Sequence, residues 1–198
     1  MNSTDAPDRT RARNRLVLLG LFALFFVPIA VAMLLNGADM RPAPGRAKGE
    51  LLDPRPDLRA VTLMQTGGGR YQWNPEARLW RIVALAPARC GDACAASARG
   101  IDTVWQLFNK DADRVDVLWL CADTSCEVPA RVRGIATLRV LRDNATLRAL
   151  EPRQRAPGMD DAVPVLVVDP YGFVVLRYAP GFDPADLRSD MNKLLKLR

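Results

Sequence analysis

The strongest hydrophobic pattern in the chain is an uninterrupted apolar run close to its N-terminus. Residues 16–35 read LVLLGLFALFFVPIAVAMLL and contain no charged side chain. At about 1.5 Å per residue, a helix of this length crosses a hydrocarbon core of roughly 30 Å. The apolar core of a cleaved secretory signal is shorter, about 7–15 residues. The pattern therefore predicts a retained transmembrane helix over residues 16–35.

The segments on either side of this run predict how the helix is placed in a membrane. Residues 1–15 form a short head with four arginines, which favours a cytoplasmic N-terminus. Residues 36–50 are rich in glycine, proline and alanine, which predicts an extended tether. We therefore expect a single-pass protein of the bacterial inner membrane, in contact with lipid through its anchor, with residues 51–198 forming a periplasmic domain.

After residue 51 the hydrophobic pattern alternates between strands and helices. Apolar and alternating runs predict strands over residues 58–64, 79–87, 115–121, 136–143, 163–169 and 173–179. Helical spacing and cap signals predict helices over residues 90–109, 144–151 and 182–198. The last two strands are joined by a tight Pro-Tyr-Gly turn. This order indicates an α/β domain with a mixed sheet flanked by helices.

Local signals predict where several of these elements begin and end. Asn144 is a good N-cap for the short helix that follows it. Asp183 is a good N-cap for the last helix, with Pro184 at the first helical position and Asp186 at capping-box spacing. The three glycines at 67–69 predict a turn, because they lack the strand-to-helix context of a phosphate-binding loop.

Composition narrows the chemistry that the chain can perform. The sequence has no histidine, which excludes Ser-His-Asp and Cys-His nucleophilic sites, histidine-based zinc sites and histidine-ligated haem. The net charge is +6, but the basic residues are scattered and form no stripe interleaved with aromatic residues, so we expect no nucleic-acid partner. The four cysteines are the residues that remain for demanding chemistry near neutral pH.

The cysteines occur as two close pairs, each following a predicted strand. Cys90 and Cys94 lie at the start of a predicted helix, where unpaired N–H groups and the helix dipole stabilise a thiolate. Cys121 and Cys126 follow the next predicted strand. Because adjacent parallel strands end at the same edge of a sheet, we expect all four sulfur atoms to lie near one another.

The pattern alone leaves three interpretations of these cysteines open, since four cysteines allow three pairings. Both pairs can be structural disulfides, as is normal in an oxidising compartment. Alternatively, Cys90 and Cys94 form a redox-active couple beside a structural Cys121–Cys126 disulfide. The third interpretation is a metal site of four thiolates.

The chain resembles the Sco/SenC group of cytochrome oxidase assembly factors, which are membrane-anchored, thioredoxin-like proteins. The features that carry the resemblance are the anchor, the strand RIVALAP, the C-x-x-x-C of Cys90 and Cys94, the VDPYG turn and the closing helix. The resemblance covers residues 51–198 and implies a thioredoxin-like fold. In such folds a proline at the place of Pro164, often in a cis peptide bond, faces the cysteine loop.

The resemblance also implies copper chemistry, from which this sequence departs at the ligand histidine and at Gly91, where the Sco motif usually has a proline after its first cysteine. Sco proteins bind copper with two cysteines and a distant histidine, and they act as thiol reductants in building the Cu(A) centre. Here Met159, Asp160 and Asp161 stand where that histidine is expected. Because Cu(I) prefers soft thiolate and thioether ligands, a weak copper site formed by Cys90, Cys94 and Met159 is one hypothesis.

The leading functional hypothesis is a Sco-like factor that assists cytochrome c oxidase assembly by thiol–disulfide exchange. In this interpretation Cys90 attacks, Cys94 resolves and Pro164 shapes the docking surface. One alternative is a catalytically silent adaptor whose disulfides, including Cys121–Cys126, only stabilise the fold. Another is a Cu(I) chaperone. The expected partner is a cytochrome oxidase subunit or another assembly factor.

Overall fold

The computed structural model describes residues 6–37, 47–123, 126–152 and 157–197. The chain divides into two units, Met1–Arg46 and Ala47–Arg198, and each is described here by itself. Most of the tether predicted for residues 36–50 lies outside the described residues. The predicted boundaries between head, anchor, tether and domain stay predictions.

The first unit is the helix α1 (Ala6–Gly37), and it contains the predicted anchor. The helix is longer than the apolar run, because the arginine-rich segment before residue 16 continues it. The stretch Arg13–Val31 is long and apolar enough to cross a membrane, and none of it is buried within the structure. By length and composition, α1 is therefore suited to be a single-pass membrane anchor.

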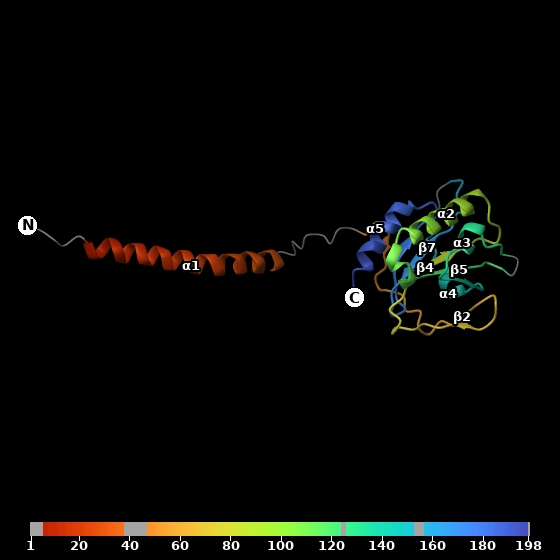
Figure 1. The fold of residues 1–198 in the computed structure, drawn as a ribbon, viewed down its shortest axis with the longest axis horizontal. Coiled ribbons are helices and arrows are strands. Elements are labelled where there is room, and N and C mark those ends of the chain that lie inside the picture. The colour runs from red at the N-terminus through yellow and green to blue at the C-terminus, as the bar shows by residue number, and fades with distance from the viewer. Residues whose placement is uncertain (1–5, 38–46, 124–125, 153–156, 198) are drawn as a thin grey trace, which may run out of the picture. The chain divides into compact units, whose positions relative to one another are not determined.

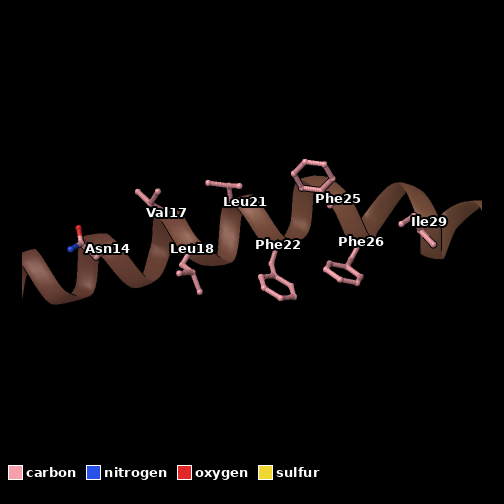
Figure 2. Close-up of a pocket in the computed structure, with 8 residues that line it drawn as sticks. All are labelled: Asn14, Val17, Leu18, Leu21, Phe22, Phe25, Phe26 and Ile29. Carbon is pink, nitrogen blue, oxygen red and sulfur yellow. The ribbon is translucent and has the colours of Figure 1, made fainter.

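The surface of α1 carries a hollow lined almost entirely by apolar side chains (Figure 2). Its lining residues are Asn14, Val17, Leu18, Leu21, Phe22, Phe25, Phe26 and Ile29. The rings of Phe22 and Phe26 stack with their centroids 4.8 Å apart. A groove on one isolated apolar helix is a surface that lipid chains would fill, so we do not treat it as a ligand site.

The second unit is built on a six-stranded mixed sheet in the order β1-β8-β7-β4-β5-β6. The strands are β1 (Glu50–Leu51), β4 (Trp80–Leu85), β5 (Val115–Leu120), β6 (Leu138–Leu141), β7 (Val165–Val168) and β8 (Val174–Tyr178). Strands β4, β5 and β6 are parallel, whereas β7 pairs antiparallel with both β4 and β8. The predicted α/β fold with a mixed sheet is confirmed.

Helices and a small hairpin cover the two faces of this sheet (Figure 1). One face packs against α2 (Asp92–Gln106), α3 (Ala130–Arg133) and α5 (Pro184–Leu194). The other packs against α4 (Ala145–Arg148) and the hairpin of β2 (Leu63–Met64) and β3 (Arg70–Tyr71). A 3-10 helix, η1 (Asn109–Arg114), precedes β5.

The central strands are largely apolar because both of their faces are buried, and Arg81 in β4 and Asp116 in β5 are the charged exceptions. In β4, Ile82 and Ala84 pack into the cluster under α2, whereas Val83 and Leu85 pack into the cluster on the opposite face. The same alternation occurs in β5 and β7. Continuous apolar runs of this kind are typical of strands covered on both sides.

The strand predicted over residues 58–64 is wrong for most of its length. Only Leu63–Met64 forms a strand, β2, and it pairs with β3 rather than with the main sheet. The amide of Leu58 donates to the carbonyl of Gly172 at 2.8 Å, and the amide of Val61 donates back to Leu58 at 2.9 Å. This turn buries Leu58 and redirects the backbone before a longer strand can form.

The predicted turn and helix caps are present in the structure, with one exception. Gly68 and Gly69 make the turn between β2 and β3 with positive φ values of 94° and 82°. Asn144 accepts hydrogen bonds from two amides at the start of α4, at 3.0 and 3.2 Å. Asp183 caps α5 in the same way. Asp186, expected in a capping box, instead lies 3.8 Å from the ammonium group of Lys48.

A buried carboxylate fastens the beginning of the folded unit to its last helix. Asp190 is 2% exposed and accepts hydrogen bonds from the backbone amides of Lys48 and Gly49. It also accepts from the Tyr178 hydroxyl at 2.9 Å and the Lys193 ammonium at 3.1 Å. Burial raises the pKa of Asp190, but hydrogen bonds, led by that from Gly49, outweigh it and hold the pKa below its ordinary value.

Replacing this carboxylate is expected to destabilise the folded unit. Asp190→Ala leaves several buried donors without an acceptor, so the free energy of unfolding should fall by about 3 kcal/mol in urea titrations. The matched control is Asp186→Ala on the same helix, which removes only a surface ion pair with Lys48 and should cost less than about 1 kcal/mol. A loss at Asp190 no larger than that of the control would contradict the prediction.

The same carboxylate should make the stability of the folded unit depend on pH. Because the pKa of Asp190 is lower in the folded chain than its ordinary value of 3.8, its contribution is present above that value. The contribution is lost as the pH falls through the folded pKa. The stability difference between the native chain and Asp190→Asn should therefore narrow below about pH 4.

Candidate redox site

The first cysteine pair lies where α2 begins, directly after the buried strand β4. Cys90 and Cys94 form a disulfide with their Cα atoms 5.1 Å apart. Cys94, in the first turn of α2, is fully buried, whereas Cys90 is only half-buried. Cys90 is therefore the more accessible of the two cysteines. The attacking and resolving roles assigned to the two cysteines stay predictions.

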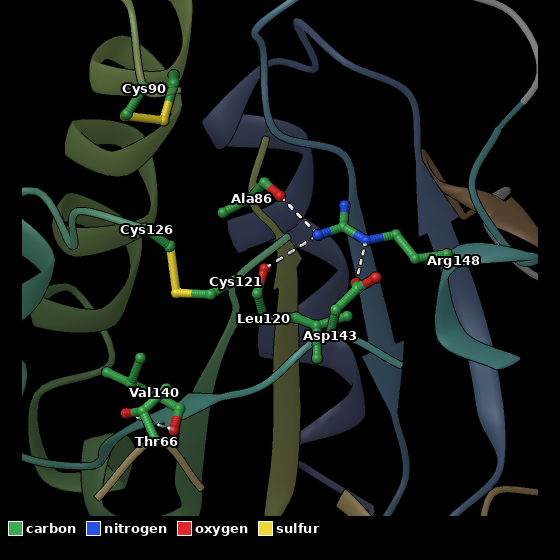
Figure 3. Close-up of a disulfide and its surroundings, with 10 residues drawn as sticks. Thr66, Ala86, Cys90, Leu120, Cys121, Cys126, Val140, Asp143 and Arg148 are labelled. Carbon is green, nitrogen blue, oxygen red and sulfur yellow. Dashed lines mark hydrogen bonds and ion pairs between the residues drawn. A yellow bond between two sulfur atoms is a disulfide. The ribbon is translucent and has the colours of Figure 1, made fainter. Parts of the chain in front are cut away.

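The second pair lies at the same edge of the sheet, after the parallel strand β5. Cys121 and Cys126 form a disulfide with their Cα atoms 5.5 Å apart, and no cysteine is free (Figure 3). Cys121 is 1% exposed and Cys126 is half-buried. All four cysteines belong to, or pack against, one hydrophobic cluster. Of the three pairings, the structure has the one that joins neighbours in sequence.

An arginine that the sequence analysis missed holds together the two strand ends that precede the cysteines. The Nη2 of Arg148 donates to the carbonyl oxygens of Ala86 at 2.6 Å and Leu120 at 3.3 Å (Figure 3). Its Nε donates to Asp143 at 2.6 Å. This guanidinium fixes the ends of β4 and β5, from which the two cysteine segments begin.

The segment before β7 faces the start of α2, as the resemblance to thioredoxin-like folds implies. The carbonyl of Pro164 accepts a hydrogen bond from the amide of Leu85, where β4 ends, at 3.0 Å. The amide of Val163 donates to the hydroxyl of Ser97 on α2 at 3.3 Å. The cis peptide bond of the described residues is Asp53–Pro54, and the Val163–Pro164 bond is trans, contrary to the cis form frequent in such folds.

The same segment brings the carboxylate of Asp161 onto the cysteine loop, a contact that the sequence analysis did not predict. The N-cap residue of α2 is Gly91, which has no side chain to accept a hydrogen bond from the first turn. The amide of Cys94 instead donates to Oδ2 of Asp161 at 3.3 Å. A Cβ atom on Gly91 would lie 2.5 Å from that oxygen, so this close approach requires glycine.

The described residues do not form a copper centre in this disulfide-bonded state. No group of three or more histidine, cysteine or acidic side chains in the described parts of the chain is arranged to hold a metal ion. The thioether of Met159 packs beside Gly181, where a Cβ would lie 3.4 Å from the sulfur. Disulfide sulfurs offer no thiolate to Cu(I). The proposed ligand set of Cys90, Cys94 and Met159 concerns the reduced chain and stays a prediction.

Comparison with known families identifies the class of protein that this fold and site define. Residues 80–198 match the model of the family described as "Transmembrane-like, thioredoxin-like, C-terminal domain". This match covers more than half of the chain, and the chain therefore belongs to that family. No curated protein matches the chain.

Solved structures with the same fold include Sco proteins. The apo Sco1 protein from Thermus thermophilus is 17% identical with a TM-score of 0.53, covering 78% of this chain and 98% of that one. BsSco, a member of the Sco family of cytochrome c oxidase assembly proteins with a disulfide switch, is 11% identical with a TM-score of 0.51, covering 77% and 100%. At these identities the similarity shows a common fold, which confirms the predicted Sco-like, thioredoxin-like architecture.

Proposed function

We propose that this protein is a membrane-anchored, Sco-like factor that assists cytochrome c oxidase assembly by thiol–disulfide exchange at Cys90 and Cys94. The observation that carries the proposal is the Cys90–Cys94 disulfide at the N-terminus of α2, with one accessible and one buried sulfur. A helix N-terminus stabilises a thiolate, which is the reactive form of cysteine. The similarity of the fold to that of Sco proteins supports the proposed role in cytochrome c oxidase assembly.

The chemistry requires two consecutive exchanges with the disulfide of a partner protein. The Cys90 thiolate attacks one partner sulfur, which forms a mixed disulfide while the partner's S–S bond breaks and its second sulfur leaves as a thiolate that takes up a proton. The Cys94 thiolate then attacks the sulfur of Cys90 and releases the first partner sulfur. Two electrons pass to the partner, and the chain is left with the Cys90–Cys94 disulfide.

The different burial of the two cysteines supports this order of steps. The attacking thiolate approaches in line with the disulfide bond that it breaks. The cysteine that reacts with the partner therefore has to be accessible. Cys90 is half-buried, whereas Cys94 is fully covered and is therefore restricted to the intramolecular step. The trans-linked Pro164, held beside the end of β4, would border the surface on which the partner docks.

We place the exchange on the outer face of the bacterial inner membrane, with α1 as a single-pass anchor and the arginine-rich head in the cytoplasm. Two disulfides in one domain are typical of an oxidising compartment such as the periplasm. The partner would be an oxidase subunit or another assembly factor that carries a disulfide. A dithiol reductant of the same compartment would restore the reduced chain.

The proposal is tested by a Cys90→Ala/Cys94→Ala variant in a cell that depends on this protein. Loss of both sulfurs should reduce the amount of assembled cytochrome c oxidase to that of a strain in which the gene is deleted. The control is a Cys121→Ala/Cys126→Ala variant, which also loses one disulfide and should retain most of the assembled oxidase. A midpoint potential of the Cys90–Cys94 couple above about −300 mV is also expected, because structural disulfides lie below that value.

A second candidate is a catalytically silent adaptor that docks onto the same partner. It is favoured by the observation that all four cysteines are disulfide-bonded and belong to, or pack against, one hydrophobic cluster. In that case the Cys90→Ala/Cys94→Ala variant would fold and support normal oxidase activity. That outcome would reject thiol–disulfide exchange and leave the anchored scaffold.

A further inference from the structure

We propose that Asp161 is a positioning residue that lowers the midpoint potential of the Cys90–Cys94 couple. The dithiol form of the couple is then a stronger reductant. The inference deepens the proposed function, on which it rests, by assigning the direction in which the site prefers to pass electrons. It follows from a single long-range contact, in which a carboxylate takes the place that a helix cap would normally occupy.

The geometry places the carboxylate within the cysteine loop itself. Oδ2 of Asp161 accepts the hydrogen bond of the Cys94 amide at 3.3 Å and lies against the Cα of Gly91. Asp161 comes from a distant part of the sequence, 67 positions away from Cys94. Its segment is held in place by the hydrogen bond from Val163 to Ser97 on α2. The contact is therefore built by the fold and does not depend on a flexible neighbour in sequence.

Capping by Asp161 acts differently on the two oxidation states of the site. In the disulfide form, the carboxylate satisfies an otherwise free amide at the positive end of the α2 dipole and stabilises the helix. In the dithiol form, a thiolate on Cys94 would need that same positive end. The carboxylate occupies it and repels the thiolate, since like charges at close range disfavour ionisation.

The balance of these two effects fixes the direction of the shift. A couple becomes a stronger oxidant when its reduced, thiolate form is stabilised. Asp161 stabilises the oxidised form and destabilises the thiolate, so it lowers the midpoint potential and makes the dithiol a better electron donor. This direction agrees with a site that hands electrons to the disulfide of a partner.

Other charged groups near the loop are placed where solvent weakens their effect. Arg89, directly before Cys90, and Asp92, in the first turn of α2, are both exposed. Asp160 is also exposed, whereas Asp161 is half-buried against the loop. Interactions of exposed charges are screened by water and salt. Asp160 therefore provides a matched control, with the same charge one residue away.

The test is the equilibrium between the full-length chain in detergent and glutathione redox buffers, for the native chain, Asp161→Asn and Asp160→Asn. Alkylated peptides containing Cys90 and Cys94 are quantified by mass spectrometry, which separates them from the second disulfide. For Asp161→Asn the equilibrium constant for disulfide formation should fall about tenfold, equivalent to a midpoint potential about 30 mV more positive.

An unchanged equilibrium constant in Asp161→Asn, or an equal change in Asp160→Asn, would overturn the inference. If Asp161→Asn does not fold, Asp161→Ser tests the same idea with a neutral cap and should shift the constant in the same direction. The result is independent of the partner. If the equilibrium constant shifts tenfold but the cysteines are dispensable for oxidase assembly, only the proposed function is rejected. If assembly depends on the cysteines but the equilibrium constant does not shift, only the role of Asp161 is rejected.

Discussion

Replacing Cys94 by serine is expected to stop exchange at the mixed disulfide and to reduce turnover to the uncatalysed background. The buried sulfur of Cys94 is the atom that would release the partner from Cys90. Without it, Cys90 can still attack a disulfide but cannot pass to the second step. With excess glutathione disulfide as a model partner, the variant should accumulate one glutathione adduct on Cys90, detected by the mass of the intact chain.

The reciprocal variant provides the control for this assignment. Cys90→Ser removes the accessible sulfur and leaves only the covered sulfur of Cys94, so adduct formation should be much slower than in Cys94→Ser. Both variants are best compared in a chain that also carries Cys121→Ser and Cys126→Ser, so that one reactive thiol remains. Faster adduct formation at Cys94 than at Cys90 would reverse the proposed roles.

The sequence predicts the helices and strands that arise from a hydrophobic pattern or from a neighbouring cap residue. The runs at 79–87 and 115–121 are each apolar except for one charged residue, and they form β4 and β5 at the centre of the sheet. The cap residue Asn144 acts on the amides that follow it, so its role could be inferred from sequence. The two-residue strands β1 and β3 are too short to show any alternation, and their existence depends on distant partners.

In the candidate site, too, the features with a local cause were predicted and the long-range contacts were not. The C-x-x-x-C motif and the parallel arrangement of β4 and β5 were sufficient to expect both cysteine pairs at one sheet edge. The contacts of Asp161 and Arg148 were not predicted because they span 67 and 62 positions of sequence, with no spacing that indicates them. Gly91 is the one signal in the sequence for the contact of Asp161, since a helix that begins on glycine lacks its own side-chain cap.

A buried arginine in β4 is the clearest case of a residue whose sequence context conceals its role. Arg81 lies in an apolar run and is fully buried, and its Nε donates to the Tyr71 hydroxyl at 3.0 Å. Tyr71 in turn donates to the carboxylate of Asp116, in β5, at 2.7 Å. The Nη1 of Arg81 donates to three backbone carbonyls, and its guanidinium lies 5.3 Å from the ring centre of Trp73. The guanidinium of Arg81 thereby links the hairpin β2–β3 to the main sheet, in addition to the backbone hydrogen bonds between the hairpin and β6.

Arg81→Met is therefore expected to lower the free energy of unfolding by about 3–5 kcal/mol, measured by urea titration of the full-length chain. The loss arises because the carboxylate of Asp116, which is 6% exposed, loses the cation linked to it through Tyr71, and because three backbone carbonyls each lose one donor. Arg139→Met on the exposed side of β6 is the matched control and should change stability by less than about 0.5 kcal/mol. If the charge of Asp116 is the cause, adding Asp116→Asn to Arg81→Met should recover part of the loss, and a loss below about 1 kcal/mol for Arg81→Met would show that the cation contributes little.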